Sequence, residues 1–234
     1  LLACSFNTEL MYEIGRAGGI EAKENGIGIW LTPAMNIHRN PLCGRNFEYF
    51  SEDPLLTGAM AAAIVRGVQK TGVSACPKHF ACNNQETNRT YNDSRLSERA
   101  LREIYLKGFE ICVKTANPQN IMTSYNKING VWGHYNYELC MRILRGEWNY
   151  QGNVMTDWWM RSSASPEFPG IKDQAYRVRA GVNVLMPGGG RTGRRKPDGT
   201  LLKTLGKSEG ITLGELQQNA AQVLNFIMNS NKMK

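Results

Sequence analysis

The alternation of short apolar runs with amphipathic stretches narrows the range of folds more than any other feature of this sequence. Runs of strand length are separated by stretches in which apolar residues recur at helical spacing. This order is typical of βα units arranged around a parallel sheet. The sequence therefore predicts an α/β fold with five strands, at residues 27–33, 73–80, 120–126, 153–159 and 182–187.

Helix signals stand between the predicted strands. Asp53 is a typical N-cap residue and Gly72 is a typical stop, so a helix is expected between them. A second helix is predicted to start at Ser97, and a third after Thr212, which has capping-box spacing to Glu215. The second helix carries an apolar stripe of Leu101, Ile104, Tyr105, Phe109 and Val113.

The number of visible strands is too small for a closed barrel. A (β/α)8 barrel has eight strands and takes about 250 residues, whereas this chain of 234 residues shows five runs of strand type. Either further strands are too irregular to recognise, or the chain is a segment of a longer protein. The length itself requires one domain only, which is expected to cover residues 1–234.

Composition indicates a soluble globular protein, because 41% of the residues are hydrophobic and 21% are charged. No apolar run reaches the roughly 18 residues of a membrane span, and the chain does not start with a signal peptide. A cytoplasmic, bacterial-type location is therefore expected.

The six cysteines fit free thiols, and they show neither CxxC pairs nor zinc-type spacing with the three histidines. We expect no metal and no cofactor.

The formal net charge of +8 raises the alternative of a polyanionic partner. The densest basic cluster, GGGRTGRRKPDG at residues 188–199, is rich in glycine and has no aromatic residues that could stack on bases. Fingerprints of the GxxxxGK[ST] and GxGxxG type are absent from the sequence. A solvated loop is favoured, with no nucleic acid and no membrane as partners, and a basic phosphate-binding domain stays as the less favoured reading.

Polar residues follow the predicted strands at the point where each strand ends. Lys78, His79, Tyr125, Asp157 and Trp158 should converge, because parallel strands point their carboxyl ends to one face. A carboxylate held on a strand end beside an indole suits glycoside chemistry, since sugar C–H faces pack on indoles. The simpler alternative is that Asp157 only caps the following loop.

The cationic residues near these strand ends also have two readings each. Lys78 could hydrogen-bond sugar hydroxyls and keep a carboxylate ionised, or it could form a buried ion pair while the backbone satisfies His79. Arg45 lies in a long aromatic loop, CGRNFEYFSEDP, where it could reach the same pocket or bridge Glu48 or Glu52.

Five motifs in register, GRNFEYFSEDP, KHF, MTSYN, VMTDWW and MPGG, resemble glycoside hydrolase family 3. The resemblance implies a TIM-like (β/α)8 barrel that is incomplete here, and a retaining exo-acting β-glycosidase that removes terminal non-reducing β-D-glucosyl residues. It implies that Asp157 is the nucleophile and that Trp158 packs against the sugar. The remaining residues that it assigns to the sugar subsite are Arg45, Lys78, His79, Met122 and Tyr125, and Tyr125 could also hydrogen-bond Asp157.

Two elements of the family pattern are missing from the chain. The family has an early aspartate in a DGP-like motif, and its β-glucosidase branch has an acid/base glutamate on a separate α/β sandwich domain; neither is present. The N-acetylglucosaminidase branch instead uses a histidine in an Asp-Ser-His loop, where this chain has Arg95, and a guanidinium cannot shuttle a proton. Glu86 is the best internal candidate for the acid on residue type, although a loop-stabilising pair with Arg89 is favoured.

The expected partners are thus β-linked glucosides or short oligosaccharides and the missing α/β sandwich domain of the same enzyme, and a homo-oligomer is allowed. We expect the acid/base to lie outside the chain, which would then be a segment of a longer protein. The alternatives are a sugar-binding fragment without turnover, and a β-xylosidase or other exo-glycosidase of the same family.

Overall fold

Five parallel strands form the centre of the computed structural model, which describes residues 1–160, 173–187 and 199–230. They follow one another in chain order, and the parallel bridges Ala34–Lys78 and Phe80–Thr123 continue the pairing between the named strands. No pairing joins the last strand to the first within the described ranges. All five strands predicted from the sequence are confirmed, as β1 Ile29–Trp30, β2 Ser74–Ala75, β4 Asn120–Met122, β7 Asn153–Trp158 and β8 Val184–Met186.

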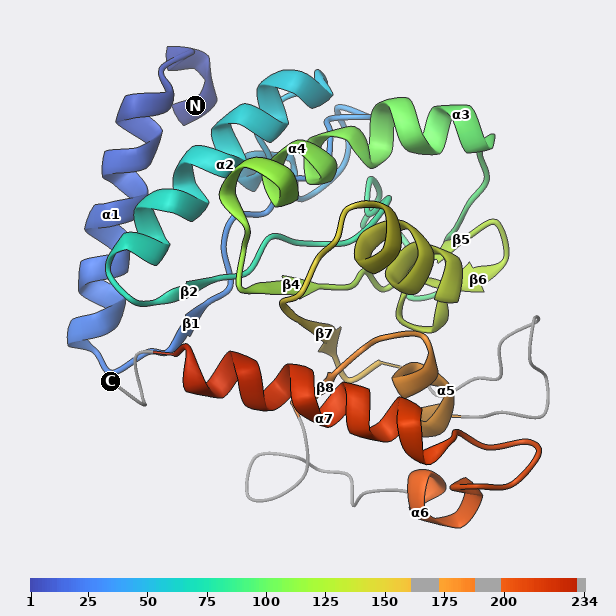
Figure 1. Ribbon diagram of the computed structural model, residues 1–234. Coiled ribbons are helices and arrows are strands. Elements are labelled where there is room, and N and C mark those ends of the chain that lie inside the picture. Colours follow the sequence, from blue (N-terminus) through green and yellow to red (C-terminus); the bar gives the residue numbers. More distant parts are fainter. Residues whose placement is uncertain (161–172, 188–198, 231–234) are drawn as a thin grey trace.

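Helices separate the central strands, as expected for βα units. Figure 1 shows α1 (Thr8–Glu24), α2 (Pro54–Lys70) and α4 (Lys107–Ala116) side by side over one side of β1, β2 and β4. Helix α7 (Leu213–Met228) lies beside β7 and β8. The main helices are α1 Thr8–Glu24, α2 Pro54–Lys70, α4 Lys107–Ala116, the π-type helix Glu138–Glu147, α5 Asp173–Arg179 and α7 Leu213–Met228. Shorter helical turns are Leu2–Ser5, Asn46–Glu48, α3 Glu98–Ala100, Gly133–Tyr135 and α6 Thr200–Thr204.

The helix ends follow the sequence signals. The Asp53 side chain accepts hydrogen bonds from the backbone N–H groups of Leu55 and Leu56 at 2.6 and 2.9 Å. Thr212 and Glu215 form the reciprocal capping box at the start of α7. The helix predicted from Ser97 also starts there, but a π-helical turn over Leu101–Tyr105 separates α3 from α4. Spacing of apolar residues does not distinguish such a turn from an α-helix.

A small side sheet was not predicted from the sequence. It consists of β3 Asp93–Ser94, β5 Lys127–Ile128 and β6 Val131–Trp132, with β5 pairing β3 in parallel and β6 antiparallel. Strands of two residues are too short to show the alternation of apolar and polar residues that marks a longer strand. This sheet ties the loop after β2 to the loop after β4.

Helices α1 and α2 pack so closely that their backbones touch. A Cβ atom at Gly67 would collide with the backbone oxygen of Tyr12, and one at Gly15 would collide with the backbone of Ile64. The buried side chains of α2 belong to the main core, which also contains Phe80, Phe109 and many smaller apolar side chains. Glycine is therefore required where these two helices cross.

A buried arginine anchors β7, the strand that carries Asp157. Arg145 donates hydrogen bonds to the carbonyl oxygens of Gly152 and Gly181 and to Oδ1 of Asn183, at 3.1, 3.0 and 2.8 Å. The same Asn183 oxygen accepts the backbone N–H of Val154. Hydrogen bonds to a charged donor are among the stronger ones, so the beginnings of β7 and β8 are fixed to one helix.

The basic cluster at residues 188–199 and the glycines of the MPGG motif lie outside the described residues, apart from Gly199. Within the parts of the chain that the structure describes, none of the helices is both long enough and apolar enough for a membrane crossing.

Candidate active site

Asp157 lies near the carboxyl end of β7 and is almost buried, with 6% of its surface exposed. Its Oδ1 atom accepts the backbone N–H of Trp158 at 2.7 Å, whereas no hydrogen bond reaches its Oδ2 atom from the described residues. Burial raises the pKa of Asp157 from its ordinary value, and the Trp158 N–H and the charges of Arg45 and Arg89 partly offset this. One oxygen thus has the local turn role considered above, and the other is left for a ligand.

His79 faces the second oxygen of Asp157. The distance from His79 Nε2 to Asp157 Oδ2 is 3.6 Å, and the histidine side chain is 2% exposed. Burial, together with the nearby charges of Arg45 and Lys78, lowers the pKa of His79 well below its usual range. The histidine is therefore neutral, and the contact is not an ion pair. The His79 backbone is held by Asn36, which accepts its N–H and donates to its carbonyl, both at 2.9 Å.

Glu48 joins the two cations that were predicted for this site. Its Oε1 atom forms an ion pair with Nε of Arg45, and its Oε2 atom lies 4.0 Å from Nζ of Lys78. Of the two carboxylates considered for Arg45, the partner is thus Glu48. Arg45 bridges Glu48, and its charge also favours the ionised form of Asp157 and the neutral form of His79.

Tyr125 and Trp158 are connected through the backbone. The Tyr125 hydroxyl donates to the carbonyl oxygen of Trp158 at 2.8 Å, and it also lies close enough to the Asp157 carboxylate to favour the ionised form of that group. Burial and the Asp157 charge raise the pKa of Tyr125 to about 12, so its hydroxyl stays protonated at neutral pH. The Trp158 indole packs on a small apolar cluster that contains Met122 and Met155.

Arg89 belongs to this group of residues, although the sequence had indicated only a pair with Glu86. That pair is confirmed, since Arg89 Nη1 donates to Glu86 Oε2 at 2.7 Å. The guanidinium carbon also lies 4.5 Å from the centre of the Tyr125 ring, in the range of a cation–π contact. The position of Arg89 in the loop after KHF was the only available signal, because a loop gives no periodicity to predict where a side chain points.

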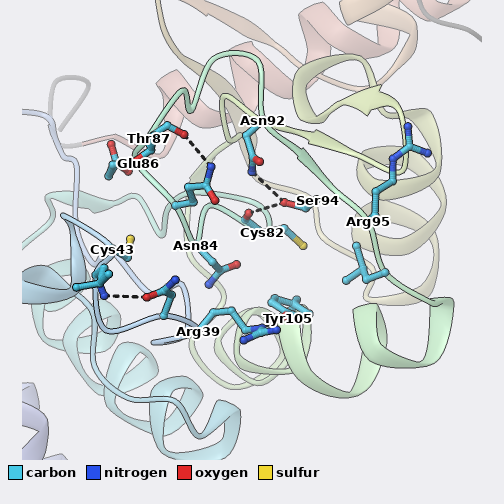
Figure 2. A pocket seen from close by; sticks show the side chains of 14 residues that line it. Arg39, Cys43, Cys82, Asn84, Glu86, Thr87, Asn92, Ser94, Arg95 and Tyr105 are labelled. Carbon is cyan, nitrogen blue, oxygen red and sulfur yellow. Dashed lines mark hydrogen bonds between the residues drawn. The ribbon is translucent and has the colours of Figure 1, made fainter.

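A cavity of about 600 Å³ has Glu86 in its wall (Figure 2). Its walls come from the loop around Arg39 and Cys43, the segment from Cys82 to Thr87, and the strand residue Ser94. Arg95, the residue in place of the family histidine, lies at its edge with 72% of its side chain exposed and pairs with Asp93 at 2.6 Å. A second cavity of about 90 Å³ lies between Tyr125, Trp132 and Trp159. Asp157 lines neither cavity.

No three His, Cys, Asp or Glu side chains of the described residues are grouped closely enough to hold a metal ion. All six cysteines are unpaired, and five of them are buried.

Comparisons with known proteins agree on one family. The model of the glycosyl hydrolase family 3 N-terminal domain matches residues 1–226. Beta-glucosidase A of Butyrivibrio fibrisolvens is 46% identical over 234 residues, which are 100% of this chain and 26% of that protein. An exo-alpha-(1->6)-L-arabinopyranosidase of Bifidobacterium longum is 47% identical over 186 residues, covering 80% of this chain and 23% of that protein.

A solved structure confirms the fold class. Beta-glucosidase 3B from Thermotoga neapolitana in complex with alpha-D-glucose superposes with a TM-score of 0.89 at 44% identity, covering 99% of this chain and 31% of that one. The prediction of an α/β, TIM-like barrel that is present only in part is thereby confirmed. The chain spans about a quarter of the length of the curated relatives named here.

Proposed function

Because the chain belongs to glycosyl hydrolase family 3, we propose that it carries the nucleophile half of a retaining exo-acting β-glycosidase that removes terminal β-D-glucosyl residues. The observation that carries the proposal is the Asp157 carboxylate on its strand end: one oxygen is held by a backbone N–H, and the other lies 3.6 Å from neutral His79 without a hydrogen bond within standard distance from the described residues. Support comes from relatives named beta-glucosidase and from a glucose complex of a similar structure.

In the proposed first step, Oδ2 of Asp157 attacks the anomeric carbon and the bond from that carbon to the leaving oxygen breaks. The leaving oxygen takes a proton from a general acid. In the second step, water attacks the same carbon, the bond from that carbon to Oδ2 of Asp157 breaks and frees the carboxylate, and the proton of the water passes to the conjugate base of the acid. Each step inverts the anomeric carbon, so the configuration is retained overall. A covalent glycosyl ester on Asp157 lies between the two steps.

We propose that neighbouring cations keep Asp157 reactive and hold the sugar. Arg45 and Arg89 favour the ionised carboxylate against the effect of burial. The Lys78 side chain is 15% exposed, and we propose that its ammonium donates to sugar hydroxyls as a charged donor. The half-buried Trp158 indole offers an apolar face for the sugar ring, on a support that includes Met122.

The general acid/base is proposed to lie on a domain beyond these 234 residues. The nearby carboxylates are already engaged, because Glu48 pairs with Arg45 and Glu86 pairs with Arg89. They are placed to hold these cations rather than to protonate a leaving group. The length of the relatives leaves room for such a domain, since their matching segment is about a quarter of each protein.

An activated substrate tests the proposal on this chain. The leaving group of 2,4-dinitrophenyl β-D-glucoside needs little protonation, so the first step can proceed without the general acid. We expect a burst of dinitrophenolate that is stoichiometric with the protein and absent from Asp157→Asn. Measurable glucose binding without any burst would instead favour a sugar-binding fragment without turnover.

A different sugar is the second candidate, because a relative of similar identity is named for an arabinopyranoside. A β-xylosidase or another exo-glycosidase would use the same Asp157 chemistry. Parallel burst measurements with the dinitrophenyl β-xyloside and α-L-arabinopyranoside distinguish these activities, since the favoured sugar gives the fastest burst.

A further inference from the structure

Both carboxylate oxygens of Glu86 accept hydrogen bonds from side chains. Its Oε2 atom accepts from Arg89 at 2.7 Å, and its Oε1 atom accepts from the side-chain amide of Asn83 at 3.1 Å. We propose that Glu86 is a positioning residue of the candidate active site, which holds the Arg89 guanidinium over Tyr125 and thereby beside Asp157. The consequence for catalysis rests on the proposed function, whereas the positioning itself does not.

The anchor of Glu86 is part of the core. Asn83 is 1% exposed and Tyr49 is 4% exposed. The Asn83 amide donates to the Tyr49 hydroxyl at 3.1 Å, and that hydroxyl donates to the Asn83 carbonyl at 3.2 Å. Glu86 therefore has a fixed position before it binds Arg89. The pair between Glu13 and Arg16 has the same sequence spacing, but its side chains are 46–47% exposed, so it is held far less firmly than the pair between Glu86 and Arg89.

Arg89 continues the chain of contacts to the nucleophile. Its guanidinium lies over the Tyr125 ring, and the Tyr125 hydroxyl binds the carbonyl of Trp158, the residue after Asp157. A long arginine side chain loses much rotamer freedom when it is fixed in one place. Without Glu86, the contact with the Tyr125 ring is the one described interaction of the guanidinium that would oppose that loss, so the guanidinium would move into solvent.

Removal of Glu86 would change the pKa of Asp157 in opposite directions, depending on how Glu86 acts. If Glu86 acted only through space, its removal would delete a negative charge and lower the pKa of Asp157. If it acts by holding Arg89, its removal takes a positive charge away from Asp157, and the pKa rises further above the ordinary value. The direction of the change therefore separates positioning from simple electrostatics.

A direct titration of Asp157 is practical because the chain contains only five aspartates. Protein labelled with ¹³C at the aspartate carboxyl gives five signals, and Asp157→Asn identifies the one of interest. We expect Glu86→Ala to raise the pKa of Asp157 by about half a pH unit or more, and Arg89→Ala to raise it at least as much. Glu86→Gln, which keeps an acceptor for Arg89, should return the pKa toward the wild-type value.

A double variant shows whether Glu86 acts through Arg89. If Glu86 acts through Arg89, then Glu86→Ala causes no further rise in a protein that already carries Arg89→Ala. Glu13→Ala is the matched control and should leave the Asp157 signal unchanged. Thermal unfolding checks that each variant is folded, and if Glu86→Ala does not fold, Arg89→Ala and Arg89→Gln test the same contact from the other side.

An unchanged or lowered pKa of Asp157 in folded Glu86→Ala would overturn the positioning role. The role would also be overturned if Glu86→Ala raised this pKa as much in a protein that carries Arg89→Ala as it does in the wild type. An unchanged pKa in folded Arg89→Ala and Arg89→Gln would overturn it as well. The titration needs no turnover. A missing dinitrophenolate burst with the expected pKa changes would therefore refute the proposed function while leaving the role of Glu86 intact.

Discussion

Nε2 of His79 lies 3.6 Å from Oδ2 of Asp157, and both side chains are buried. Burial and the surrounding cations lower the pKa of His79 well below its usual range, so this neighbour does not supply a positive charge. The ionised form of Asp157 depends instead on the Trp158 N–H and on Arg45 and Arg89. The site thus keeps a neutral imidazole near the reacting oxygen of Asp157, and the charges that favour its ionised form come from the two arginines.

The raised pKa of Asp157 predicts a specific dependence of stability on pH. The unfolded chain loses the Asp157 proton near pH 4, whereas the folded protein holds it to a higher pH because of burial. This contribution to stability is complete at low pH and is lost as the pH rises through the folded-state pKa. Asp157→Asn cannot show this loss.

The melting temperature of Asp157→Asn, relative to wild type, should therefore increase between pH 4 and pH 7. Calorimetry of both proteins across this range measures the difference. A wild type that gains stability relative to the variant as the pH rises would mean that the Asp157 pKa is lowered in the folded protein.

Lys78→Met should weaken glucose binding by about 10- to 100-fold, because a hydrogen bond from a charged donor contributes about 1.5–3 kcal/mol. The variant keeps the length and the apolar stem of the side chain. Lys23→Met, on the exposed end of α1, is the control and should bind as wild type does. Titration calorimetry measures both, and equal affinities for the two variants would exclude Lys78 from the sugar site.

The adjacent tryptophans should differ strongly in their effect on glucose binding. Trp158 is half-buried and packs on the cluster with Met122, whereas Trp159 is 59% exposed. Trp158→Ala should weaken binding by about fivefold or more, and Trp159→Ala by less than about twofold. The same calorimetric titration compares them. A larger loss of affinity in Trp159→Ala would contradict the role of Trp158 and would indicate that the sugar packs on Trp159, beside the cavity that Trp132 also lines.

Gly67→Ala should lower the free energy of unfolding by about 1–3 kcal/mol, because the added methyl group overpacks the contact between α1 and α2. Gly214 is the matched control in the first turn of α7, where a Cβ atom meets only Thr212 Oγ1 at 3.8 Å. Gly214→Ala should be stabilising by about 0.4–1 kcal/mol. Urea unfolding gives both values, and a Gly67→Ala protein as stable as wild type would contradict the close packing.

The strands could be predicted from the sequence because their apolar residues come in short runs. Residues 153–159 show this well, since the buried Val154 and Met155 precede Asp157 on β7. The convergence of Lys78, His79, Tyr125 and Asp157 followed from the common direction of parallel strands. The side sheet around Lys127 could not be predicted, because its two-residue strands depend on tertiary contacts between loops.

Side-chain partners within the site were harder to predict than positions along the chain. The sequence left Glu48 and Glu52 equally open as partners of Arg45, and the 3₁₀ turn at Asn46–Glu48 decides for Glu48. It also gave no reason to place Arg89 over Tyr125. Both contacts depend on the path of long loops, which carry no periodic signal.

Covalent trapping tests the central claim most directly. 2,4-Dinitrophenyl 2-deoxy-2-fluoro-β-D-glucoside forms the glycosyl ester but slows its hydrolysis, so the labelled residue can be found by peptide mass spectrometry. The measurement is made on this chain, with Asp157→Asn as the unlabelled control. We predict one glycosyl group on the Asp157 carboxylate. A label on another residue, or no label on protein that releases dinitrophenolate in a burst, would contradict the account.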